Sequence, residues 1–327
     1  MTSSKPSRSR RSQTKPASPT SSAFKQAMQG VRQPNTTFQN VSLRWLLSAI
    51  GFVLLGAIAC AWLALCLLYW QGSWQLLYHP KATITRTPAS VGLPFEQIRF
   101  AATETGVTQL TGWWIPNTDS RYTALYLHGA DGNLSDSIDT LAALHRNNLS
   151  VFAFDYRGYG QSHIEGIPIR PSEKQLRQDA EWALTWLTLM RHMPPQSVII
   201  VGSGLGANLA AELAADHNEV AGVILDQPLQ DATAVIFNDP RSRLVPARLM
   251  VKDRYDLNNA TASLHIPSLW LLPQAQSHSA VDAPQALQAV PSQKTSAWLK
   301  PPVIADPHFD ETLKRWLDEL PINVTRQ

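Results

Sequence analysis

The chain has 327 residues, of which 44% are hydrophobic and 16% charged, a composition typical of a globular protein with one large domain and extensions. Residues 1–44 carry eight Lys and Arg and no acid, so the remainder holds 20 basic against 25 acidic residues. The basic charge therefore belongs to the first segment, and the acidic body offers no surface of the kind that binds nucleic acid.

Residues 1–43 are rich in Ser, Thr, Pro, Gln and Arg, and we expect a disordered basic tail because they have little apolar surface to bury. The next segment, 44–69, is predicted to be a transmembrane signal anchor. No charge occurs over 45–69, a run long enough at about 1.5 Å per residue to cross a bilayer core of about 30 Å. Trp45 and Tyr69 mark its two ends, as aromatic residues do at membrane interfaces.

The orientation of this span follows from the charges beside it. All nearby positive charge precedes the span, so we expect a cytoplasmic N-terminus and residues 70–327 on the other side, in the periplasm if the cell is a Gram-negative bacterium. The basic stretch and the apolar run are both longer than those of a cleaved signal peptide. Both cysteines, Cys60 and Cys66, lie in the span, so the domain beyond it has no disulfide and no thiolate nucleophile.

Beyond the span, residues 70–94 are predicted to be a juxtamembrane linker and residues 95–322 an α/β domain. Apolar and β-branched runs predict strands at 95–100, 110–116, 123–128, 150–155, 198–203, 220–226, 267–272 and 295–299. Helical spacing appears at 134–146, 172–190, 205–211, 282–289 and 310–317. Because strands alternate with helices, we expect a mostly parallel, doubly wound sheet with one antiparallel edge and helices on both faces. Residues 227–262 are predicted to be irregular or helical and hold a local basic cluster.

One strand-to-helix turn organises the rest of the domain. Glycines at 202, 204 and 206 have the spacing of a nucleophile elbow, G-x-S-x-G, in which the middle residue is a catalytic serine. Here the middle residue is Gly204, and the serine stands one place earlier, at Ser203.

Several separated stretches have the pattern of one known family. They are L-x-G-W-x-x-P at 110–116, His-Gly with Gly-Asn at 128–133, D-Y-R-G-Y-G-Q-S at 155–162, Pro-Ser-Glu at 171–173 with Asp-Ala at 179–180, the glycine elbow, and Asp-Arg-Tyr-Asp at 253–256. Together they resemble the α/β-hydrolase superfamily, and more narrowly its membrane-anchored abhydrolase-domain branch related to serine aminopeptidases and depalmitoylases. The resemblance covers about residues 74–320.

The resemblance implies a serine–histidine–acid triad, of which this sequence keeps one member. The nucleophile position falls on Gly204, the acid position on Gln276, and the histidine on His308. A glycine has no oxygen that can attack a carbonyl, and a glutamine cannot balance the charge of an imidazolium. The resemblance also implies an oxyanion hole from the backbone N–H groups of Ala130 and Leu205, which the loss of the serine leaves in place.

Three hypotheses follow, of which the third is a purely structural envelope protein with no ligand site. In the first, the domain is a catalytically inactive hydrolase fold that binds an acyl or other carboxylate ligand, or a protein partner, beside the bilayer. In the second, it is a membrane-anchored esterase, thioesterase or peptidase with a rearranged site, in which Ser203 is the nucleophile or His308 activates water; Asp226 is an alternative acid. The sequence predicts no cofactor, no metal ion and no nucleic-acid partner.

Overall fold

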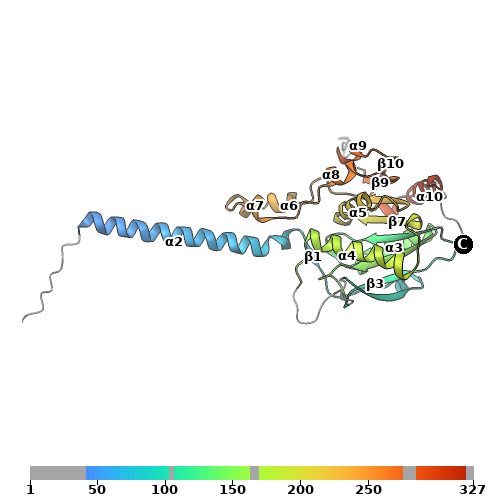
Figure 1. Ribbon diagram of the computed structural model, residues 1–327, viewed down its shortest axis with the longest axis horizontal. Coiled ribbons are helices and arrows are strands. Elements are labelled where there is room, and N and C mark those ends of the chain that lie inside the picture. Colours follow the sequence, from blue (N-terminus) through green and yellow to red (C-terminus); the bar gives the residue numbers. More distant parts are fainter. Residues whose placement is uncertain (1–41, 103–106, 163–168, 275–284, 322–327) are drawn as a thin grey trace, which may run out of the picture. The chain divides into compact units, whose positions relative to one another are not determined.

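The computed structural model describes residues 42–102, 107–162, 169–274 and 285–321 (Figure 1). The chain divides into two compact units, residues 1–60 and 61–327, and the boundary falls within the long helix α2 (Leu43–Gly72). Helix α2 is the one helix among the described residues that is long and apolar enough to span a membrane.

An eight-stranded sheet forms the centre of the second unit. Its strands in chain order are β2 (Glu96–Ala101), β3 (Thr108–Ile115), β4 (Tyr122–Leu127), β6 (Leu149–Asp155), β7 (Val198–Ser203), β8 (Gly222–Asp226), β9 (Ser268–Pro273) and β10 (Lys294–Leu299). They lie in the order β10-β9-β8-β7-β4-β6-β3-β2. Strands β4, β6 and β8 are buried along their whole length, as expected for parallel strands covered on both faces.

The predicted antiparallel edge of the sheet is confirmed, and it is formed by β2 and β3. Strand β3 is antiparallel to both of its neighbours, β2 and β6, so the antiparallel strand is second from the edge. The reason is the short connection between β2 and β3, which makes a hairpin and cannot carry a parallel crossover. The predicted strands that correspond to β4, β6, β7, β8, β9 and β10 are confirmed as parallel to one another.

Helices cover both faces of the sheet, as predicted (Figure 1). Helices α3 (Ile138–Arg146) and α10 (Phe309–Glu319) pack into the apolar cluster on one face. Helices α4 (Glu173–Thr185), α5 (Leu205–Asp216) and α8 (Leu257–Ala262) pack into the cluster on the other. The short helix α9 spans Gln285–Ala289, and α6 (Ala234–Phe237) and α7 (Ala247–Met250) lie in the connection between β8 and β9.

The segment that we expected to be a linker, residues 70–94, makes packed and hydrogen-bonded contacts with the domain. Leu77 and Tyr78 are buried in the same apolar cluster as α4 and α5. Strand β1 (His79–Pro80) pairs with β5 (Asp131–Gly132) in a small parallel sheet of two strands. The residues that follow α2 therefore brace the loop after β4.

Candidate functional site

The turn between β7 and α5 has the backbone of a nucleophile elbow. Gly204 lies between the two elements with φ +57° and ψ −120°, a conformation that side chains other than hydrogen rarely adopt. Its N–H donates to the carbonyl oxygen of Asp226 at 2.9 Å, which ties the turn to the end of β8. A Cβ placed on Gly204 would meet no heavy atom within 4 Å, so the position faces open space but carries no side chain.

The two flanking glycines are required by close packing. A Cβ on Gly202 would lie 2.1 Å from the carbonyl oxygen of Gly206, and one on Gly206 would lie 2.2 Å from that of Leu127. Real Cβ atoms do not approach backbone oxygens this closely. The elbow thus keeps the tight strand–helix packing of an enzyme site, while its central position has no nucleophilic atom.

Ser203 is bonded to a buried carboxylate. Its Oγ donates to Oδ2 of Asp226 at 2.9 Å, and Gln227 donates from Nε2 to the other oxygen at 3.3 Å. Burial raises the pKa of Asp226, and the two donated hydrogen bonds oppose that rise. The hydroxyl of Ser203 therefore satisfies an acid at the end of the neighbouring strand.

His308 precedes the first turn of α10 and has an acidic neighbour that the sequence reasoning missed. Its Nδ1 lies 3.0 Å from Oδ1 of Asp306, and its side chain is 75% exposed. The Asp306 carboxylate also accepts the backbone N–H groups of Lys300 at 2.7 Å and His308 at 2.9 Å, and these bonds lower its pKa. The D-P-H order was the available signal, because an Asp often bonds the backbone two residues on. Gln276 lies outside the described residues.

The two candidate oxyanion donors follow adjacent parallel strands. Leu127 on β4 is the register partner of Gly202 on β7, and Ala130 and Leu205 each come three residues later. Leu205 is the first residue of α5, whose first N–H groups have no partner within the helix. The carbonyl of Ala130 accepts from the backbone N–H of His79 at 3.0 Å and the hydroxyl of Tyr159 at 2.9 Å, so the loop is held from both sides.

A buried polar cluster lies under this loop. Burial lowers the pKa of His128 to about 4 and raises that of Asp155 to about 7, and His128 Nε2 lies 3.8 Å from Oδ1 of Asp155. The hydroxyl of Tyr156 donates to the carbonyl of His128 at 3.1 Å. A Cβ on Gly160 would lie 2.0 Å from Oδ2 of Asp155, which explains a glycine there. The D-Y-R-G-Y-G stretch is thus structural support for the loop.

A buried ion pair joins this stretch to α4. Asp179 is fully buried. Its carboxylate accepts hydrogen bonds from Nε of Arg157 at 2.6 Å and from the backbone N–H of Arg157 at 2.8 Å. Burial nevertheless raises the pKa of Asp179 to about 6, against the lowering effect of the guanidinium. The pair fixes the end of β6 on the helix that follows it.

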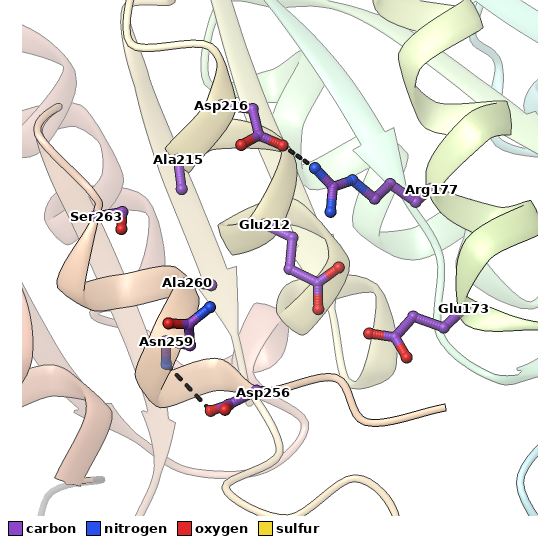
Figure 2. Close-up of a pocket in the computed structure, with 9 residues that line it drawn as sticks. All are labelled: Glu173, Arg177, Glu212, Ala215, Asp216, Asp256, Asn259, Ala260 and Ser263. Carbon is purple, nitrogen blue, oxygen red and sulfur yellow. Dashed lines mark hydrogen bonds and ion pairs between the residues drawn. The ribbon is translucent and has the colours of Figure 1, made fainter. Parts of the chain in front are cut away.

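A hollow of about 210 Å³ lies between α4, α5 and α8 (Figure 2). Glu173, Glu212, Asp216 and Asp256 line it, and Arg177 forms an ion pair with Asp216. Burial, followed by the nearby charge of Glu173, raises the pKa of Glu212 to about 8. Glu173 itself accepts the backbone N–H groups at positions 254 and 255, at 2.6 and 3.0 Å, so it fixes the loop before α8. Among the described residues no group of His, Cys, Asp and Glu is arranged to hold a metal ion.

Related sequences share the central part of the chain. Uncharacterized protein Rv2307c of Mycobacterium tuberculosis is 33% identical over 202 residues, which cover 61% of this chain and 68% of that protein. YfhR of Salmonella typhimurium is 30% identical over 203 residues, covering 57% of this chain and 64% of its own length. Alpha/beta hydrolase domain-containing protein 17C of Xenopus tropicalis is 37% identical over 123 residues, covering 37% of this chain and 38% of that protein.

Solved structures support the fold at low sequence identity. The esterase Pf2001 of Pyrococcus furiosus has a TM-score of 0.54 at 17% identity and covers 75% of this chain and 97% of its own. An α/β hydrolase of Vibrio vulnificus has a TM-score of 0.51 at 21% identity and covers 70% and 81%. A family model for the α/β-hydrolase fold matches residues 124–298, just over half of the chain. The chain belongs to the α/β-hydrolase fold family.

Proposed function

We propose that this protein is a membrane-anchored member of the family that binds a carboxylate-bearing ligand and does not hydrolyse it through a serine. The observation that carries the proposal is Gly204, which has the backbone conformation of the nucleophile at the elbow and no side chain. Acyl transfer through a covalent intermediate needs an activated oxygen or sulfur at that point. The hydroxyl of the adjacent Ser203 donates a hydrogen bond to the Asp226 carboxylate, so the partner that the structure gives it is an acid and not a histidine.

The ligand class follows from the backbone N–H donors that remain at the site. The N-terminus of α5 presents backbone N–H groups and the positive end of a helix dipole, which attract carboxylates. Ala130, at the corresponding place after β4, is the second expected donor. In an active relative these groups would stabilise the oxyanion; with the serine absent they suit a permanent anion, such as the carboxylate of a fatty acid or of a chain terminus.

The anchor is helix α2, and the basic residues before it favour an N-terminus in the cytoplasm with the domain on the other side, the periplasm in a Gram-negative cell. A chain integrated in this way stays with membranes after carbonate extraction. A protease added outside cells with permeabilised outer layers then removes the domain and leaves the tail. Extraction by carbonate, or protection of the domain, would contradict this topology.

Ligand binding is tested with octanoate and, as the uncharged control, octanol, by calorimetry on the full chain in detergent. Because the Cβ direction at Gly204 opens into free space, a large side chain there blocks the site while a methyl group does not. We expect Gly204→Phe to abolish octanoate binding and Gly204→Ala to retain it. If the protein bound octanoate and octanol equally well, or if Gly204→Phe and Gly204→Ala bound octanoate equally well, the anion site would be refuted.

One observation favours a second function, a hydrolase that activates water. Nδ1 of His308 is oriented by Asp306 at 3.0 Å, which leaves an oriented and exposed imidazole. A histidine held by a carboxylate is a competent general base. This function predicts slow hydrolysis of p-nitrophenyl esters that His308→Ala removes, with Ser203→Ala testing the rearranged nucleophile. Unchanged rates in both variants would leave only background hydrolysis and refute this candidate.

A further inference from the structure

The connection from β8 to β9 exposes large apolar side chains beside buried ones. Val235 is 50% exposed, Leu244 60% and Leu249 85%, all within fifteen residues that contain helices α6 and α7. Their neighbours Ile236 and Val245 are buried in the domain core. Single exposed leucines are common on protein surfaces, whereas a group of this kind indicates a surface that contacts something else.

The same segment is basic. Arg243, Arg248 and Lys252 are exposed, and Arg241 pairs with Asp239 at 2.8 Å, the one acid between residues 234 and 252. Exposed apolar groups beside unneutralised basic groups are typical of a surface that lies on an anionic bilayer.

Two hydrogen bonds join this segment to the final turns of α2. The indole Nε1 of Trp62 donates to the carbonyl of Leu244 at 3.0 Å, and the hydroxyl of Tyr69 donates to that of Ile236 at 3.2 Å. Leu65 and other residues of these turns line a cavity of about 210 Å³ together with Arg241. All of these residues belong to the unit that starts at Ala61.

The length of α2 fixes the depth of this contact. Its 30 residues extend about 45 Å at 1.5 Å per residue, while a bilayer core of about 30 Å takes about 20 residues. A span that begins at Leu43 therefore leaves the core near Trp62, seven residues before the end at Tyr69 that the sequence predicts, and tryptophan favours such a boundary. Leu244, bonded to Trp62, lies at the same depth.

We propose that residues 234–252 form a second membrane contact, with Val235, Leu244 and Leu249 in the acyl boundary and the basic side chains on the headgroups of anionic phospholipid. The occupant of this surface is the leaflet from which α2 emerges, so the inference rests on the anchoring proposed above. Continuity with the apolar helix and the positive charge of the segment favour a lipid surface over a second copy of the chain.

The contact is tested with an environment-sensitive NBD label on the full chain in vesicles of phosphatidylglycerol and phosphatidylcholine. In a Cys60→Ser, Cys66→Ser background the label is placed at Leu249→Cys, or at Leu189→Cys as the control. Leu189 is 65% exposed and lies on the turn after α4. We expect a blue shift and quenching by brominated lipid at position 249, and aqueous, unquenched emission at 189.

The charge requirement is tested by adding Arg243→Glu and Arg248→Glu, with Lys314→Glu and Arg315→Glu on α10 as the matched control. The first pair is expected to reduce the quenching at position 249 and to remove its dependence on phosphatidylglycerol, and the control pair is expected to change neither. If the label at position 249 shows the same aqueous, unquenched emission as the label at position 189, the contact is refuted. A blue shift that follows protein concentration and ignores brominated lipid assigns the surface to a second copy and also refutes it.

Carbonate extraction of the same vesicles separates this inference from the anchor. A carbonate-resistant chain with an aqueous 249 label refutes the second contact alone. A chain that carbonate removes refutes the anchor and the contact together.

Discussion

Gly204→Ser places a hydroxyl at the centre of the elbow and tests how much strain the turn imposes on a side chain there and whether that serine alone gives hydrolysis. Gly204 has φ +57° and ψ −120°, and its Cβ direction is free of atoms within 4 Å, so the serine meets strain and no clash. That strain costs about 1–3 kcal/mol. The loss of glycine freedom in the unfolded chain returns about 0.4–1 kcal/mol. The expected net destabilisation is therefore about 1–2 kcal/mol.

The assay is thermal unfolding of the full chain in detergent at a fixed scan rate. For a domain of about 150–250 residues, 1 kcal/mol lowers Tm by about 2–4 °C, so a destabilisation of about 1–2 kcal/mol should lower Tm by about 2–8 °C. Gly204→Ala should give the same fall, since both substitutions add a Cβ in the same conformation. Gly206→Ala should be much more damaging, because its Cβ meets the Leu127 carbonyl oxygen at 2.2 Å.

Ester hydrolysis by Gly204→Ser should stay near background, because the resemblance assigns the acid position of the triad to Gln276, which cannot balance the charge of an imidazolium. A Tm for Gly204→Ser at or above that of the unsubstituted chain would refute the strain argument. A Gly206→Ala variant no less stable than Gly204→Ala would refute the packing of the elbow. Turnover restored by the single serine would show that the remaining groups suffice for catalysis.

Three other substitutions probe the frame of the site. Arg157→Met leaves the Asp179 carboxyl buried without its cation and should lower the free energy of unfolding, measured by chemical denaturation, by about 3–5 kcal/mol. Arg86→Met breaks an exposed ion pair and should leave the unfolding midpoint nearly unchanged. Ser203→Ala removes a hydrogen bond to a buried carboxylate and should cost about 1–2 kcal/mol without changing any ester hydrolysis; a lost rate would make it the nucleophile. The pKa of Glu212 is raised to about 8, so the folded chain binds this proton more tightly than the unfolded chain does. The free energy of unfolding should therefore fall as pH rises from about 5 to 8, by up to about 1.4 kcal/mol per pH unit. Glu212→Gln should flatten that slope, and an unchanged slope would show that other groups cause the pH dependence.

The sheet and its helices were predictable because their signals are local. Apolar runs bounded by turns located the central strands, and the glycines at 202, 204 and 206 predicted a strand-to-helix turn that the structure confirms. The pairing of β3 with β6 was not predictable, because the two strands are distant in sequence. The contacts of residues 77–80 with the loop after β4 are long-range in the same way.

In the site, the residue types were predictable and their partners were not. The sequence shows that Gly204 lacks a nucleophilic atom, and the resemblance implies where the base would lie. The hydrogen bond from Ser203 to Asp226 joins register partners on the adjacent strands β7 and β8, and the neighbour of His308 is Asp306, two residues away. The first needs the register of β7 and β8, and the second needs the entry geometry of α10. Only the second has a local signal in the sequence, the D-P-H order at 306–308.

The most direct test of the central claim is the intact mass of the purified full-length chain after exposure to excess fluorophosphonate, with an active serine hydrolase in the same tube as the positive control. These reagents add covalently to an activated serine. Because the elbow carries Gly204, we predict no mass increase for this chain while the control is fully modified. A stoichiometric adduct that maps to Ser203, or to any other serine, and disappears when that serine becomes alanine would contradict the account.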